Sequence, residues 1–378
     1  MRIVDHPVES QGTEPERSPR TLNRRTILKA AGAVSAAPLV SALSQTPFVS
    51  QGGRPPNLNC EPPRIPLEPT TQKFIDSLAG AKPLYTMTPA AAHAVLTDLQ
   101  KKPLPPGVTL RPADIKDVVW PVGPTGSTRI RIYRPQDATG VLPVVMYFHG
   151  GGWVLGDKIT HDRLVRELTD GVKAAFVFVD YINSPEAKYP RQNEQAYASM
   201  KYVVEHAREL MVDATRLAIA GDSVGGNMCA AITLMAKERS GPRIAYQVLF
   251  YPLTDFQSND SSYQRYANGP WLTAANLKWM FELQGLNGTE GITAFPLRAT
   301  VEQLRGLPDA LVITDDDVLQ DEGEEYAGKL SQAGVRVTTV RYNQTIHDFV
   351  MLNPLANTPA ARGAIAQGIW ALRGALHT

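Results

Sequence analysis

The sequence predicts an α/β protein with a mostly parallel central sheet. Short apolar runs of strand length alternate with helical segments, and these runs lie near Val144, Ala175, Leu217, Gln247, Leu311 and Val335. Glycine-rich turns follow two of the runs, as at the carboxyl ends of strands in parallel sheets. The chain has 378 residues, 43% of them hydrophobic, which is enough for one large core.

The amino-terminal part of the chain is expected to lie outside the folded domain. Residues 1–42 resemble a twin-arginine export signal, because Arg24 and Arg25 precede a short, mildly apolar run from Ala30 to Val40. Residues 43–69 are predicted to form a proline-rich linker. We therefore expect export, to the periplasm or out of the cell. The alternative is a disordered tail with incidental arginines on a cytoplasmic protein.

Residues 70–378 are expected to form the folded domain. It should begin with two helices and a β-hairpin and end with an amphipathic helix; the expected ranges are Thr70–Ala79, Pro89–Lys102, Ile115–Trp120 with Thr128–Tyr133, and Ala360–Leu376. Thr70 or Thr71 is predicted to cap the first helix. Thr88 is predicted to cap the second, with Pro89 at its first position.

A serine between glycines is the first candidate for chemistry. Ser223 is the centre of the run from Gly221 to Gly226, which contains the pattern G-x-S-x-G. In this pattern, a tight strand-to-helix turn holds the serine in a strained conformation with its hydroxyl exposed. The flanks agree, because Leu217–Ala220 has strand length and Val224–Ala236 has helical character. The pattern alone is common by chance, so Ser223 needs support from the rest of the chain.

A second glycine-rich run, from His149 to Trp153, follows the predicted strand near Val144. Attack on a carbonyl group places negative charge on its oxygen, and backbone N–H groups must already point there. Glycine permits such a close approach. We therefore expect an oxyanion hole made by the N–H groups of Gly151, Gly152 and Val224. A glycine-rich turn without chemistry is the alternative, but it would not predict the serine turn downstream.

An acid and a histidine follow the serine in the chain order typical of this arrangement. A strand-like run from Ala310 to Ile313 leads to Asp317, and a predicted strand from Val335 to Tyr342 leads to a loop that holds His347. We predict that Ser223, His347 and Asp317 form a catalytic triad. His149 is expected to shape the oxyanion loop, and the other histidines considered are more typical of surface, core or processed positions: His6, His93, His161 and His206.

Together these motifs resemble those of hormone-sensitive-lipase-type carboxylesterases in the α/β-hydrolase superfamily. They occur in the family's order between about Asp117 and the C-terminus; they are His149–Trp153, Asp180-Tyr181 with Pro185-Glu186, Gly221–Gly226, Asp317–Gly323 and His347. The resemblance implies an α/β-hydrolase fold with a helical cap from residues 70–110 and about 255–300. It also implies hydrolysis of short- to medium-chain esters through an acyl-enzyme on Ser223, and no cofactor is expected.

Three positions depart from the family's pattern. Tyr181 is not followed by the usual arginine, leucine and alanine. The segment that leads to Asp317 looks about one residue shorter than the family's acid-bearing loop, which leaves Asp316 as the alternative acid. His347 is followed by Asp348, where the family often has glycine. None of these differences removes a catalytic group.

The predicted cap insertion holds several aromatic residues and methionines, which at helical spacing are more often core than binding surface. Trp153, Trp271 and Phe349 are nevertheless the candidates for lining an apolar pocket for the acyl or alcohol group. Such a pocket separates substrates that differ by one methylene by only about 1 to 3 kcal/mol. We therefore expect broad substrate acceptance.

The composition argues against nucleic-acid binding, a membrane span, a disulfide framework and a metal site. The net charge of +1 supplies no basic stripe for nucleic acid, and no segment approaches the roughly 20 apolar residues of a stable membrane span. The two cysteines, Cys60 and Cys229, set no disulfide framework, and no Cys/His cluster has the spacing of metal ligands. The expected partner is a small-molecule ester, and a homodimer stays open.

Other functions of the same constellation also stay open. An amidase, a lactonase or an acyltransferase would use the same triad, and the motifs do not separate these enzymes from an esterase. The resembled fold also supports ligand-binding proteins that lack the working histidine. Because Ser223, Asp317 and His347 are all present, the sequence favours an enzyme.

Overall fold

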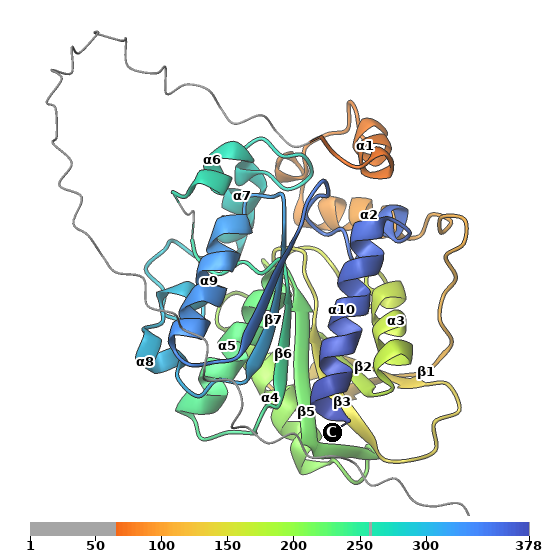
Figure 1. Ribbon diagram of the computed structural model, residues 1–378, viewed down its shortest axis with the longest axis vertical. Coiled ribbons are helices and arrows are strands. Elements are labelled where there is room, and N and C mark those ends of the chain that lie inside the picture. The colour runs from red at the N-terminus through yellow and green to blue at the C-terminus, as the bar shows by residue number, and fades with distance from the viewer. Residues whose placement is uncertain (1–65, 257–258, 378) are drawn as a thin grey trace, which may run out of the picture. The chain divides into compact units, whose positions relative to one another are not determined.

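An eight-stranded sheet forms the centre of the fold (Figure 1). The computed structural model describes residues 66–256 and 259–377. The strand order is β1-β2-β4-β3-β5-β6-β7-β8, with bounds β1 Ala113–Trp120, β2 Thr128–Pro135, β3 Leu142–Phe148, β4 Ala175–Asp180, β5 Val212–Asp222, β6 Tyr246–Phe250, β7 Asp309–Asp315 and β8 Val337–Tyr342. The predicted signal, Cys60 and residues 43–65 of the predicted linker lie outside the described residues.

The pairing of the strands confirms a mostly parallel sheet. β1 pairs with β2 as the predicted antiparallel hairpin, with Trp120 opposite Thr128, and β2 pairs antiparallel with β4. All other neighbouring strands of the sheet are parallel. The residues of β4 are all buried, which is the pattern of a strand covered by helices on both faces.

Helices cover both faces of this sheet. α3 and α10 pack together on one face, while α4, α5, α8 and α9 lie on the other, and α1, α2, α6 and α7 gather beyond one end of the sheet (Figure 1). The bounds are α1 Pro69–Asp76, α2 Pro89–Gln100, α3 Asp162–Val172, α4 Arg191–Glu205, α5 Val224–Glu238, α6 Ser261–Arg265, α7 Ala274–Gln284, α8 Val301–Leu304, α9 Gln320–Gln332 and α10 Pro359–Leu376, with 3-10 turns at Leu84–Thr86, Pro296–Arg298 and Asn353–Leu355.

The cap of the first helix differs from the sequence prediction. Glu68 precedes α1, and its carboxylate accepts the N–H groups of Thr70 and Thr71, so neither threonine is the cap. One carboxylate satisfies two free donors and also carries the negative charge that a helix N-terminus favours. α2 begins as predicted, with the Thr88 hydroxyl as its cap and Pro89 at its first position.

Two hydrophobic clusters fill the space between the sheet and its helices. Met146 of β3 and Ile219 of β5 belong to one cluster, while their neighbours Val145 and Ala218 belong to the other. This split follows from strand geometry, because successive side chains point to opposite faces. The sheet is thus buried on both sides, and chemistry is left to the loops at the ends of its strands.

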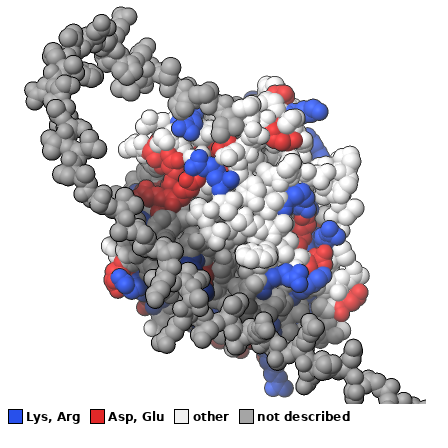
Figure 2. Space-filling view, in the orientation of Figure 1, with Lys and Arg blue, Asp and Glu red and all other residues white. Residues whose placement is uncertain are grey.

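The surface carries charges of both signs. On the face shown in Figure 2, acidic and basic side chains are interspersed, and the basic ones form no continuous stripe. Broad areas of uncharged residues lie between them on the same face. Within residues 66–256 and 259–377, none of the helices combines the length and the apolar character needed to cross a membrane.

Candidate active site

Ser223 occupies the turn between β5 and α5. Its φ of 55° and ψ of −120° are unfavourable for a residue other than glycine, and its N–H donates to the Phe250 carbonyl at 2.8 Å. A Cβ added to Gly221 would lie 2.4 Å from the Gly225 carbonyl oxygen, and one added to Gly225 would lie 2.0 Å from that of Phe148. Only glycine fits at both positions. The two glycines therefore permit the strained strand-to-helix turn that the sequence pattern predicts around Ser223.

His347, in the loop after β8, connects this serine to an acid. Its Nε2 lies 2.9 Å from Ser223 Oγ, and its Nδ1 contacts Asp317 Oδ2. The other oxygen of Asp317 accepts the Leu319 N–H at 2.8 Å, which fixes the carboxylate. Burial lowers the pKa of His347, but the negative charges of Asp348 and Asp317 outweigh burial and hold that pKa above its ordinary value.

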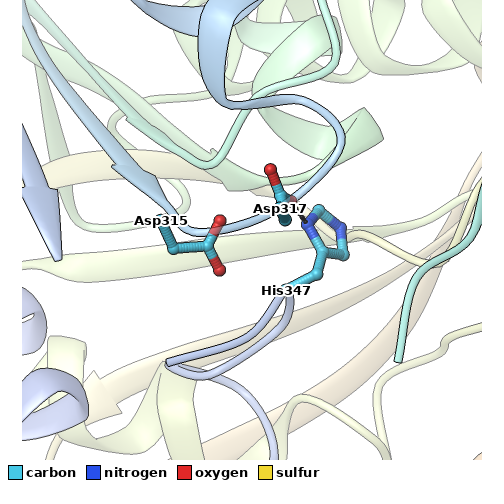
Figure 3. Close-up of side chains that lie close together, drawn as sticks. All are labelled: Asp315, Asp317 and His347. Atoms are coloured by element: carbon cyan, nitrogen blue, oxygen red, sulfur yellow. Dashed lines mark hydrogen bonds and ion pairs between the residues drawn. The ribbon is translucent and has the colours of Figure 1, made fainter. Parts of the chain in front are cut away.

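Three consecutive aspartates with different surroundings lie where β7 ends: Asp315 is its last residue, and Asp316 and Asp317 follow it. Asp317 faces His347, with Asp315 beside them (Figure 3), whereas Asp316 accepts the Gln344 N–H at 2.7 Å. Asp315 is fully buried, and neither of its carboxyl oxygens has a partner among the described residues. Burial and then the nearby charge of Asp317 raise the pKa of Asp315 well above its usual range, which favours a neutral acid beside the triad.

Asp315, Asp317 and His347 also place possible metal-ligand atoms within 4.8 Å of one another. Both ring nitrogens of His347, however, already have triad partners. A hydrogen-bonded triad therefore accounts for this cluster without a metal ion.

The loop after β3 approaches the serine closely. Gly151 and Gly152 have φ values of 102° and 64°, and a Cβ on Gly151 would lie 2.5 Å from the Leu155 carbonyl oxygen. Within the described part of the chain, neither glycine N–H donates a hydrogen bond. Val224 is the first residue of α5, where N–H groups have no intrahelical acceptor. The predicted oxyanion donors are therefore free to bind a ligand oxygen.

Asp222 supports this loop and was not singled out from the sequence. Its buried carboxylate accepts the Gly150 N–H at 3.1 Å and the Tyr147 hydroxyl at 2.7 Å, and it lies 3.2 Å from His161 Nε2. Against the effect of burial, each partner favours the charged form of the other, so the pKa of Asp222 is lowered and that of His161 is raised. The position of Asp222 directly before Ser223 was the available sequence signal.

His149 shapes the loop, as expected. Its ring stacks on Tyr181 with 4.0 Å between centroids, its Nδ1 donates to the Gly150 carbonyl, and the Tyr181 hydroxyl donates to the His149 carbonyl at 2.9 Å. Burial, followed by the nearby His161, lowers the pKa of His149 to about 4. A neutral ring that is stacked and hydrogen-bonded in this way holds a backbone conformation.

A cavity of about 550 Å³ opens at Ser223 and His347. Its walls are largely apolar and come from the α1–α2 region and from the segment between β6 and β7; they include Ile75, Leu78, Leu84, Leu96, Leu272, Leu277 and Met280. Of the three predicted pocket residues, Trp271 lines this cavity. Trp153 and Phe349 are 2% and 0% exposed and pack in the two core clusters instead.

A serine on a strand-to-helix turn, a histidine and an acid from later loops, and a glycine loop beside them define a serine hydrolase of α/β-hydrolase architecture. Comparison with known proteins agrees. A family model described as an α/β-hydrolase fold matches residues 145–351. The esterase LipI of Mycobacterium tuberculosis is 37% identical over 294 residues, which cover 76% of this chain and 88% of LipI.

A carboxylesterase of the same bacterium, NlhH, is 38% identical over 265 residues, which cover 68% of this chain and 82% of NlhH. Among solved structures, a thermostable esterase from Pseudomonas putida is 46% identical, with a TM-score of 0.79 over 82% of this chain and 98% of that one. The chain therefore belongs to the α/β-hydrolase family, among its hormone-sensitive-lipase-type carboxylesterases.

Proposed function

We propose that this carboxylesterase hydrolyses short- to medium-chain esters through an acyl-enzyme on Ser223. The hydrogen-bonded series from Ser223 through His347 to Asp317 carries the proposal. Ser223 and His347 lie at a largely apolar cavity, and such a cavity suits the acyl or alcohol chain of an ester. The relatives named esterase and carboxylesterase support an ester as the bond that is broken.

Acylation begins when Ser223 Oγ attacks the ester carbonyl carbon and gives its proton to His347 Nε2. The carbonyl oxygen becomes an oxyanion, which the N–H groups of Gly151, Gly152 and Val224 bind. Asp317 holds the imidazole with Nδ1–H toward itself and stabilises the imidazolium. His347 Nε2–H then protonates the departing alkoxide, and the alcohol leaves.

Deacylation repeats these steps with water as the nucleophile. His347 Nε2 takes a proton from water as its oxygen attacks the acyl carbon, and the same three N–H groups bind the second oxyanion. The bond between the acyl carbon and Ser223 Oγ breaks, and the proton on His347 returns to that oxygen. The carboxylic acid is released and the resting triad is restored.

The substitution Gly151→Ala, which adds a methyl group to the proposed oxyanion loop, is expected to lower kcat by about 10² to 10³-fold, with little change in KM. The added Cβ would meet the Leu155 backbone at 2.5 Å, and φ is 102°, so the loop must move and its donors with it. Steady-state kinetics of Gly151→Ala would measure this. Gly140→Ala is the matched control, because a Cβ there meets nothing within 4 Å; equal loss in both variants would contradict the oxyanion role.

We further propose that residues 70–110 and about 255–300 act as a cap that limits substrate length. Their side chains form most of the cavity wall, and its volume of about 550 Å³ lies within the range of small-molecule sites. In hydrolysis of p-nitrophenyl esters from acetyl to dodecanoyl by the full chain, kcat/KM should therefore be highest for short to medium chains. A maximum at dodecanoyl would contradict the proposed substrate class.

Matched amides in the same assay would separate an esterase from an amidase. The esterase proposal expects ester turnover to exceed amide turnover, and Ser223→Ala supplies the background. If no ester is hydrolysed above that background, the esterase proposal fails. Amide turnover equal to ester turnover would instead favour an amidase that uses the same triad.

A further inference from the structure

Asp348 stands directly after the triad histidine in an unusual backbone conformation. Its φ is 67°, in the left-handed region that glycine adopts without strain. The residue is 9% exposed, and it lines the cavity that holds Ser223. A buried carboxyl group in a disfavoured conformation costs free energy, so its presence calls for a compensating role.

The two carboxylate oxygens of Asp348 have different surroundings. Oδ2 accepts the Trp271 indole N–H at 2.8 Å, while Oδ1 lies 3.6 Å from His347 Nε2. Oδ1 is buried and has no hydrogen-bond partner among the described residues. Trp271 comes from the segment between β6 and β7, and its ring packs on Phe74 of α1 with centroids 5.5 Å apart. The proposed cap thus orients a carboxylate beside the histidine.

We propose that Asp348 is a positioning residue that acts as a second carboxylate partner of His347, held by Trp271 so that the imidazolium formed during catalysis lies between two carboxylates. The inference rests on the proposed function, because it assigns a role within the same triad. Asp317 meets the imidazole at Nδ1, and Asp348 flanks Nε2.

The geometry favours an electrostatic role over proton transfer. The Nε2 position is directed to Ser223 Oγ at 2.9 Å, whereas Asp348 Oδ1 is beyond hydrogen-bond distance. Asp348 therefore does not compete for the proton that His347 must pass to the leaving group. His347 and Asp348 are 2% and 9% exposed, so a carboxylate at this distance still stabilises a positive ring. Burial raises the pKa of Asp348, and the charge of a protonated His347 opposes that effect, so the carboxylate is favoured when the imidazolium forms.

Other charged and titratable groups surround this pair. From the elements packed around it come Asp315, Asp317, Asp222, His161 and Tyr251, in addition to the Trp271 indole. Burial disfavours a charged ring at His347, and Asp348 and Asp317 are the main opposing influences, so its pKa is raised. Because only the neutral imidazole accepts the serine proton, a raised pKa moves the acid limb of activity to higher pH.

The test is the pH profile of Asp348→Asn. Asparagine has the same shape, tolerates the left-handed conformation and can still accept the Trp271 N–H, but it carries no charge. We expect the acid-side midpoint of kcat/KM for p-nitrophenyl acetate to fall by about one pH unit, and the plateau to fall by up to about tenfold. Trp271→Phe removes the indole N–H donor together with part of a ring that packs on Phe74, and it should shift the midpoint in the same direction by less.

Asp309→Asn is the matched control, because Asp309 lies at the opposite end of β7 and pairs with Arg336. That variant removes one negative charge far from His347 and should leave the midpoint unchanged. A purely structural role of Asp348 would lower activity or thermal stability in Asp348→Asn without moving the midpoint. That result, with ester turnover by the unaltered protein, would overturn this inference and leave the proposed function intact.

A measurement without substrate distinguishes failure of the Asp348 inference from failure of the proposed esterase function. The imidazole of His347 can be titrated by ¹⁵N NMR on the full chain, with His347→Gln used to assign its resonances. Its titration midpoint should fall in Asp348→Asn even if the substrate class is wrong. An unchanged midpoint would overturn the inference, and absence of ester turnover in the unaltered protein would overturn only the proposed function.

Discussion

Replacing Ser223 by alanine is expected to lower kcat by on the order of 10⁶-fold while leaving KM nearly unchanged. The change removes the oxygen that the proposed mechanism acylates, and His347 then has no hydroxyl at 2.9 Å to deprotonate. The cavity walls and the oxyanion donors stay in place, so binding of the ester is preserved. Steady-state kinetics with the preferred p-nitrophenyl ester would measure both parameters.

Ser199→Ala is the matched control for this experiment. Ser199 is also buried, and its hydroxyl donates to the Gln195 carbonyl at 2.7 Å within α4. Its loss should affect thermal stability modestly and kcat little. A Ser223→Ala variant that retains more than a small fraction of the original kcat, at unchanged protein purity, would show that another group is the nucleophile.

The triad and the glycine loops could be predicted because their signals are local. Gly221 and Gly225 are required by contacts within one turn, and the chain order of Ser223, Asp317 and His347 follows from the order of the strands that carry them. The alternation of strands and helices likewise follows from short-range patterns of apolar residues. Such features can be recognised in the sequence because each depends on a few neighbouring residues.

The support of the site depends on contacts between distant segments, and apart from the position of Asp222 directly before Ser223 no sequence pattern indicates them. His161 meets Asp222 across 61 positions, and Trp271 meets Asp348 across 77. The sequence by itself indicates only a surface or core position for His161. It also could not tell that Phe349 packs into the core while Trp271 faces the cavity, because aromatic side chains suit both environments.

Asp317→Asn is expected to lower kcat by about 10⁴-fold, with KM little changed. The carboxylate holds Nδ1–H toward itself, which leaves Nε2 as the acceptor for the Ser223 proton. An asparagine amide can donate to Nδ1 and so favours the opposite tautomer, in which Nε2 already carries a proton. The charge that stabilises the imidazolium is lost as well. Steady-state kinetics at the pH optimum would measure the effect.

Asp316→Asn decides between the two acids that the sequence left open. Asp316 accepts the Gln344 N–H at 2.7 Å, and an asparagine oxygen can accept the same bond. We therefore expect kcat of Asp316→Asn to stay close to that of the unaltered protein, while Asp317→Asn loses nearly all activity. The reverse pattern would make Asp316 the triad acid, and equal losses in both variants would indicate that the aspartate segment acts as a structural unit.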